Sequence, residues 1–97
     1  MAHGKHIWFV SPEQNAKVRE KVTFQVTAPY AKNHYIHLSI SSEENSTSVW
    51  ESLIELHDKA YTAQIDTSNW KKGKYKAEVL LMGGLVQHPV YRYFTVE

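Results

Sequence analysis

Short segments of the chain alternate apolar and polar residues one by one. In residues 21–27 the apolar positions include Val22, Phe24 and Val26, and the positions between them are polar. Residues 34–41 repeat the pattern around a second set of aliphatic side chains. A repeat of two residues is that of a β-strand with one buried face, because successive side chains of a strand point to opposite sides. Such segments bury their apolar sides when two sheets stack face to face.

Turn-forming residues recur at the spacing of roughly 8–12 positions that is typical of an all-β sandwich. The other segments expected to form strands are 6–12, 60–66, 74–82 and 90–97, whereas 13–20 is expected to be a polar connection. With one further segment after residue 47, the chain has about seven short strands, the number found in small antiparallel sandwiches. We therefore predict an all-β fold with two antiparallel sheets.

Residues 48–59 fit both a helix and a strand. The residues that recur at helical spacing are Trp50, Leu53, Ile54 and His57. At a spacing of two, the same stretch places Trp50, Ile54 and Leu56 on one face, and a turn beginning at His57 would join this strand to the next one in a hairpin. We favour the hairpin because every other segment is strand-like, and the helix remains the alternative.

Composition excludes several classes of site and partner. The chain has no cysteine, which excludes disulfide bonds, thiolate zinc sites and iron–sulfur clusters. Its net charge of +1 argues against a nucleic-acid surface, which needs a local excess of Lys and Arg. No apolar run approaches the ~20 residues that span a bilayer, so we expect no membrane insertion. No catalytic motif such as Gly-x-Ser-x-Gly or His-Glu-x-x-His is present, and we expect no enzyme.

Three stretches resemble the bacterial immunoglobulin-like domains. They are residues 9–26, with Ser11-Pro12 after the first strand, residues 61–81, with a Gly-x-Tyr opening a strand, and the closing Phe94-Thr95-Val96. The resemblance implies an immunoglobulin-like β-sandwich in which the Tyr75 hydroxyl caps nearby backbone, as in a tyrosine corner. It also implies a spacer or accessory domain of a larger secreted or cell-surface protein. We expect one such domain over residues 1–97, with residues 1–4 left from cloning or disordered.

A weaker resemblance is to copper-binding sandwich proteins of the CopC type. The matching residues are His3, Ser11-Pro12, Gly73-Lys74-Tyr75-Lys76, His88-Pro89 and Phe94-Thr95-Val96. If His3 were the mature amino terminus, the resemblance would imply a Cu(II) site made from His3, or His6, together with His88. That family places an acidic ligand two residues before the second histidine, where this chain has Val86. The alternative is that the histidines are scattered over surface and loops and bind no metal or other cofactor.

Aromatic residues outside the expected core are candidates for a binding surface. These candidates are Trp50, Trp70, Tyr91 and Tyr93. Tyr91 and Tyr93 share one strand face, and exposed aromatic platforms suit sugar rings or protein partners. The alternative is that one sheet face simply carries tyrosines, which strands favour. We predict a non-catalytic, extracytoplasmic module that recognises a protein or cell-surface partner, with a carbohydrate-binding accessory module or a copper-binding protein as alternatives.

Overall fold

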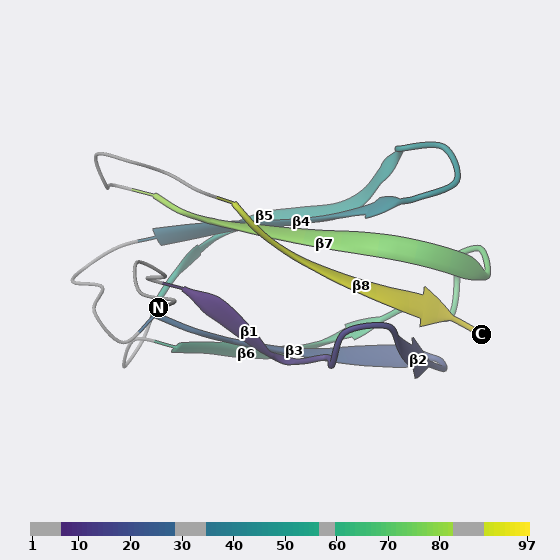
Figure 1. Ribbon diagram of the computed structural model, residues 1–97, viewed down its shortest axis with the longest axis horizontal. Helices are drawn as coiled ribbons and strands as arrows, with labels where there is room; N and C mark the ends of the chain where they lie inside the picture. The colour runs from purple at the N-terminus through teal and green to yellow at the C-terminus, as the bar shows by residue number, and fades with distance from the viewer. Residues whose placement is uncertain (1–6, 29–34, 57–59, 83–88) are drawn as a thin grey trace.

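The computed structural model describes residues 7–28, 35–56, 60–82 and 89–97, which form two β-sheets stacked face to face (Figure 1). The first sheet has three strands in the order β1 (Trp8–Ser11), β3 (Lys21–Thr27) and β6 (Ala60–Asp66). The second has five strands in the order β2 (Ala16–Val18), β8 (Val90–Val96), β7 (Gly73–Leu81), β4 (Tyr35–Ser42) and β5 (Ser48–Glu55). The arrangement confirms the predicted all-β, immunoglobulin-like sandwich. Within these ranges, no helix has the length and hydropathy needed to cross a membrane.

The alternating segments place their apolar sides in the space between the sheets, as expected. The buried core residues are Ile7, Phe9, Val22, Phe24, Val26, Ala28, Ile36, Leu38, Ile40, Ile65, Tyr75, Ala77, Val79, Phe94 and Val96. A row of aromatic rings crosses this core from β1 to β7. The Phe24 ring centroid lies 6.2 Å from that of Phe9 and 5.8 Å from that of Phe94, and Phe94 stacks on Tyr75 at 5.9 Å. Both sheets are therefore joined through ring contacts.

The prediction of a polar connection over residues 13–20 is wrong at Ala16–Val18, which form β2. This short strand pairs in parallel with the end of β8, with Ala16 opposite Phe94 and Val18 opposite Val96. The other strand pairs are antiparallel. Hydrogen bonds between the Asn15 amide and the Tyr93 carbonyl, and between the Glu97 amide and the Val18 carbonyl, extend the pairing at both ends. Three residues carry too few positions to reveal a period of two, so the pattern could not indicate β2.

Residues 48–55 form strand β5, which confirms the strand and excludes the helix. The expected hairpin with the following strand is wrong, because β5 pairs with β4 and β6 pairs with β3 in the other sheet. The chain thus changes sheets between Leu56 and Ala60. Local alternation shows that a segment is a strand but carries no information about which neighbour it pairs with.

A tyrosine corner closes the connection between β6 and β7. The Tyr75 hydroxyl donates a hydrogen bond of 2.6 Å to the Lys71 carbonyl, as the sequence resemblance implied. Gly73, between the two, has a φ of 142°, which glycine adopts without the steric cost that a Cβ would bring. The Trp70 ring packs on the Tyr75 ring at 5.3 Å. The corner therefore positions the start of β7 against the core.

One lateral side of the sandwich is closed by contacts between β1 and β8. Arg92 of β8 points inward, and its Nη2 donates a hydrogen bond of 3.1 Å to the Phe9 carbonyl of β1. The Arg92 guanidinium also lies over the Phe9 ring, at 5.6 Å from its centroid. Because β1 and β8 meet on this side, the strand orders place β6 and β5 toward the opposite side.

Candidate binding surface

The outer face of the five-stranded sheet is the candidate binding surface. On β8, Tyr91 and Tyr93 point away from the core, and the register places them opposite Glu78 and Lys76 of β7. Tyr91 is 43% exposed, and Tyr93 is half-buried. The Lys76 ammonium lies 5.3 Å from the centroid of the Tyr91 ring, a distance at which a cation interacts favourably with an aromatic face. The two tyrosines are thus held in place by the strand pairing beneath them.

Apolar side chains continue this outer face toward β4 and β5. His37 of β4 lies between Leu80 of β7 and Leu53 of β5 in the register of the sheet. Leu53 is 60% exposed and Tyr35 is 45% exposed. Exposed leucine and tyrosine side chains are the groups that a partner could cover with a gain in buried apolar area.

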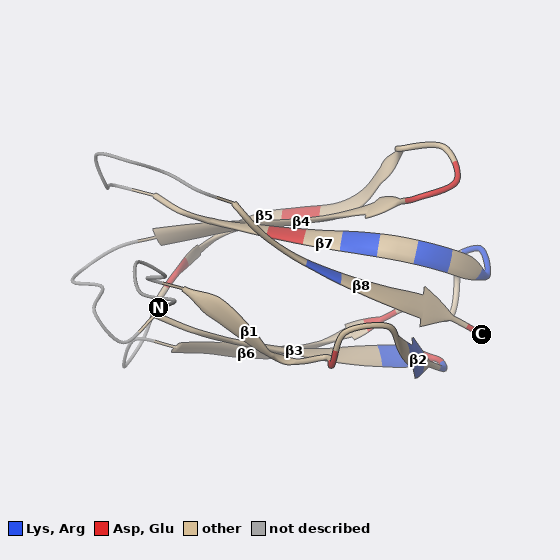
Figure 2. Ribbon diagram, viewed as in Figure 1, with Lys and Arg blue, Asp and Glu red and all other residues tan. Residues whose placement is uncertain are grey.

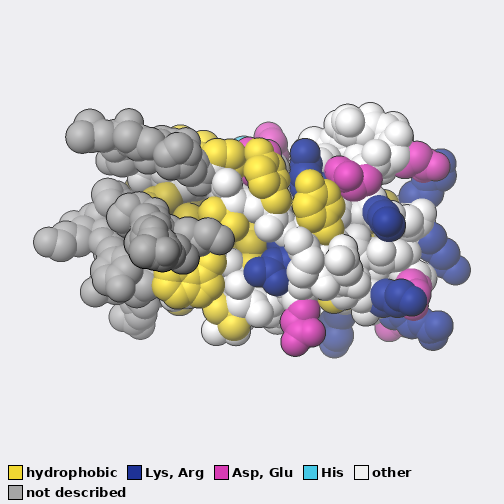
Figure 3. Space-filling view, viewed as in Figure 1, with side chains coloured by type: hydrophobic (Ala, Val, Ile, Leu, Met, Phe, Trp, Pro, Cys, Tyr) yellow, Lys and Arg dark blue, Asp and Glu magenta, His cyan; other side chains and the backbone are white. Residues whose placement is uncertain are grey.

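Figure 3 shows the side of the molecule on which β8 lies in front. Hydrophobic side chains gather in the middle of this view, beside the atoms drawn in grey, while Lys, Arg, Asp and Glu gather toward the right. The charged end carries β2, the end of β8 and the β6–β7 connection (Figure 2). On this side of the molecule, the described surface is therefore more apolar in the middle and more charged at one end of the long axis.

The structure separates the four aromatic residues predicted for binding. Tyr91 and Tyr93 share the outer face, whereas Trp50 pairs with the buried Ile40 and points toward the core. Trp50 and Trp70 are half-buried and pack against the core cluster. The sequence did not indicate Leu53 as part of a surface, although its position between Glu51 and Glu55 at a spacing of two is a signal for an outward-facing residue.

The predicted metal ligands His3, His6 and His88 lie outside the described residues. In the ranges that the structure describes, no group of three or more His, Asp and Glu side chains could hold a metal ion. His37, which is described, faces Glu51 across the β4–β5 pair, with 3.8 Å between its Nε2 and the Glu51 Oε1. The copper site therefore stays a prediction.

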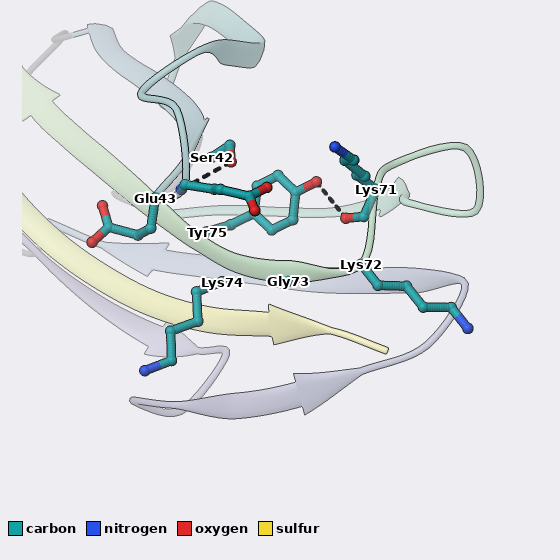
Figure 4. A pocket seen from close by; sticks show the side chains of 8 residues that line it. Ser42, Glu43, Lys71, Lys72, Gly73, Lys74 and Tyr75 are labelled. Carbon is teal, nitrogen blue, oxygen red and sulfur yellow. Dashed lines mark hydrogen bonds between the residues drawn. The ribbon is translucent and has the colours of Figure 1, made fainter.

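A pocket of ≈ 270 Å³ adjoins the tyrosine corner (Figure 4). It is lined by residues 42–44 and 71–75. The Tyr75 hydroxyl points to the Lys71 carbonyl, and the Lys72 and Lys74 side chains extend away from the tyrosine. Burial raises the pKa of Tyr75, and the negative charge of Glu44 adds to the effect. The raised pKa favours the neutral hydroxyl, and this hydroxyl donates its proton to the Lys71 carbonyl.

Comparison with known proteins shows the fold and no family. No family model and no curated protein match the chain. Among solved structures, CopC from Methylosinus trichosporium OB3b has a TM-score of 0.62 and 19% identity, over 95% of this chain and 94% of that chain. The endo-beta-1,4-mannanase from Thermotoga petrophila has a TM-score of 0.66 and 14% identity, over 94% of this chain. An engineered protein has a TM-score of 0.67 at 14% identity.

The chain spans only 19% of the mannanase and 20% of the engineered protein. At these identities the likeness concerns the sandwich fold alone, since one fold hosts many unrelated functions. The presence of CopC among the matches agrees with the sequence resemblance to that type of sandwich. A likeness to part of an enzyme does not decide whether this chain is an enzyme. The expectation that it is not an enzyme stays a prediction.

Proposed function

We propose that the chain is a non-catalytic recognition module of an extracytoplasmic or cell-surface protein. It contacts a protein or surface partner through the outer face of the five-stranded sheet, with Tyr91 and Tyr93 at the centre of the contact. The observation that carries this proposal is the exposed Tyr91 ring, with Tyr93 on the same side of a strand that pairs with β7 from Val90 to Val96. Aromatic side chains held on rigid strands lose little conformational freedom on binding.

The match to about a fifth of two longer chains supports a role as one domain of a larger protein. The mixed charges around the tyrosines, such as Lys76 and Glu78, support a specific orientation of the partner. Tyrosine is also enriched among the residues that dominate protein interfaces.

The proposal predicts that Tyr91→Ala with Tyr93→Ala weakens binding by about thirtyfold or more without unfolding the domain. The measurement is binding of the labelled protein to intact cells of the organism that expresses it. Loss of a central aromatic contact of about 2 kcal/mol corresponds to about thirtyfold weaker binding. Gln25→Ala is the matched control, because Gln25 is exposed on the opposite sheet. If the double variant binds as the original protein does, the outer face is not the contact surface.

A carbohydrate-binding module remains an alternative, and the same tyrosines would stack on sugar rings. Retardation of the protein in a gel that contains mannan or another polysaccharide would support it, and Tyr91→Ala would remove the retardation. Trp70→Ala is a less direct test, because the Trp70 ring also packs on Tyr75. Equal mobility in all gels would eliminate this alternative and leave the protein partner.

A copper-binding function is the second candidate, and the observation that favours it is the match to CopC along nearly the whole of both chains. His3, or His6, together with His88 would supply the nitrogen ligands. We expect a Cu(II) titration followed by absorbance or tryptophan fluorescence to saturate, and His88→Ala to weaken the binding. A titration without saturation would exclude the site.

A further inference from the structure

Strand β5 forms an open edge of the second sheet. Among the described strands it pairs only with β4, so the backbone groups on its other side have no strand partner there. β5 has eight residues and contains neither proline nor lysine. Its one irregularity lies at the start, where the register to β4 shifts between Ser48 and Trp50, and the pairing from Trp50 to Glu55 is regular. Proteins usually shorten, bend or charge such edges with lysine, because an open edge pairs with other chains.

The other edges of the sandwich are less suited to pairing. β1 has four residues, with an irregular register between Phe9 and Ser11, and β2 has three residues. β6 is long, but its exposed residues are Thr62, Gln64 and Asp66, which offer no apolar contact. β5 is therefore the described edge that is both long and apolar.

Apolar side chains lie on both faces of β5. On the outer face, Leu53 and Val49 are 60% and 38% exposed. On the inner face, Trp50 and Ile54 pack against the core but are only half-buried. The two sheets are aligned on one side, where β1 lies beside β8. Because the second sheet has five strands and the first has three, β5 extends beyond β6 on the opposite side. A further strand next to β5 would cover both sets of side chains.

The charge around β5 is acidic, although the whole chain carries a net charge of +1. Residues 35–56 contain four glutamates and no lysine or arginine. Figure 2 shows acidic positions on β5 and in the turn that follows β4, while the basic positions lie on β7, β8 and the charged end. On the outer face of β5, Glu51 and Glu55 flank Leu53, and the β4 residues opposite the two glutamates are Ser39 and Tyr35.

We propose that β5 binds an extended basic segment of a partner protein by strand addition. The segment adds a sixth strand to the second sheet through backbone hydrogen bonds. Lysine or arginine at positions opposite Glu51 and Glu55 supplies the charge complement, with an apolar residue opposite Leu53. The partner residues opposite Ser52 and Ile54 point inward and are apolar. The recognised segment therefore has five residues: a basic residue at each end and three apolar residues between them. This pattern is symmetric, so it fits both parallel and antiparallel pairing with β5.

A second copy of this chain is a poor occupant of the same edge. Antiparallel pairing of two β5 strands would place Glu51 and Glu55 of both copies on one sheet face. Like charges that face each other across strands destabilise the pairing. The charge pattern thus favours a basic partner strand over self-association.

The test uses a synthetic peptide with the core Lys-Val-Tyr-Val-Lys, flanked by serine and glycine. Amide NMR of isotope-labelled protein locates the binding site, and hydrogen exchange measures the protection of β5. We expect shifts and slower exchange at the amides between Trp50 and Glu55. A peptide with glutamate in place of both lysines should not bind. A peptide with proline in place of the central tyrosine should bind about tenfold more weakly or not at all, since proline cannot donate to a ladder.

Glu51→Lys with Glu55→Lys should weaken binding of the basic peptide by about tenfold or more, in the range expected for two lost charge pairs at an interface. Thr62→Lys with Gln64→Lys adds two lysines to the β6 edge and should leave the affinity nearly unchanged. Circular dichroism checks that both variants stay folded. Absence of peptide binding, equal binding of the proline peptide, or shifts at β8 instead of β5 would each overturn the proposal. A concentration-dependent dimer in sedimentation would also overturn the proposal if the Glu51→Lys, Glu55→Lys variant did not form it.

The β5 edge is separate from the tyrosine surface proposed above, and the two are distinguishable. Tyr91→Ala should leave peptide binding unchanged, because Tyr91 lies on β8, three strands away from β5. The test of strand addition at β5 is therefore independent of the test of the tyrosine surface.

Discussion

Phe24→Ala is expected to lower the free energy of unfolding by about 3–5 kcal/mol, the usual cost of deleting a buried phenyl ring. Phe24 is 0% exposed, and its ring contacts Phe9 and Phe94, so it joins the two sheets at their centre. Because domains of this size are stable by about 5–15 kcal/mol, the change removes a large share of the total. Urea denaturation followed by tryptophan fluorescence measures the loss.

Gln25→Ala is the matched control for this core variant. Gln25 is the next residue on β3, but it is exposed, so its truncation should change the stability by no more than about 0.5 kcal/mol. A loss of less than about 1.5 kcal/mol for Phe24→Ala would contradict the packing described, because it would mean that the site collapses without a cavity.

Tyr75→Phe is expected to destabilise the domain by about 1–3 kcal/mol, the cost of a buried polar group that loses its partner. The variant keeps the ring that packs between Trp70 and Phe94 but deletes the hydrogen bond to the Lys71 carbonyl. Denaturant unfolding of the two proteins measures the difference. A variant as stable as the original protein would show that the corner bond contributes nothing net.

The same pair of proteins tests the protonation state of the corner. The pKa of Tyr75 is raised by burial and by Glu44, so the folded protein favours the neutral hydroxyl. The stabilisation is fully present below the unfolded pKa and is lost as pH rises through the folded pKa. The difference in unfolding free energy between the original protein and the Tyr75→Phe variant should therefore stay constant up to about pH 9 and shrink as pH rises above the usual tyrosine pKa of about 10. Burial also raises the pKa of Tyr61, but this effect is common to both proteins and cancels.

The sequence allowed the sandwich and most of its core to be predicted, because burial on one face leaves a period of two in the chain. Val22, Phe24 and Val26 show this directly, since each is buried and the residues between them are not. The tyrosine corner was also predicted, because the Gly-x-Tyr stretch resembles the one that opens a strand in bacterial immunoglobulin-like domains. In these places local chemistry and tertiary position agree.

The sequence of residues 48–59 was ambiguous for a physical reason. Leu53 breaks the alternation, and with Trp50 and Ile54 it produces helical spacing. In the structure Leu53 is the most exposed apolar residue of the strand, on the opposite face from Trp50 and Ile54. A residue kept apolar on an outer face contradicts the pattern that sequence analysis uses, and such contradictions occur at functional surfaces.

The candidate site was less predictable than the fold. A tryptophan or tyrosine on a strand can serve the core or a surface, and the sequence alone does not distinguish the two. Trp70 and Trp50 pack partly against the core, while Tyr91 is exposed. The pairing of β5 with β4 and of β6 with β3 was also beyond local patterns, because strand partners are chosen by the whole topology.

The parallel pairing of β2 with β8 has a mechanical consequence. A pulling force on the two ends of the chain draws β2 and β8 in opposite directions along their common axis, because the strands run the same way. The hydrogen bonds between them then carry the load together in shear, whereas an antiparallel hairpin pulled from its open end breaks one bond at a time. If the domain were joined at both ends to a longer chain under tension, the hydrogen bonds between the short strand β2 and β8 would thus resist its unfolding.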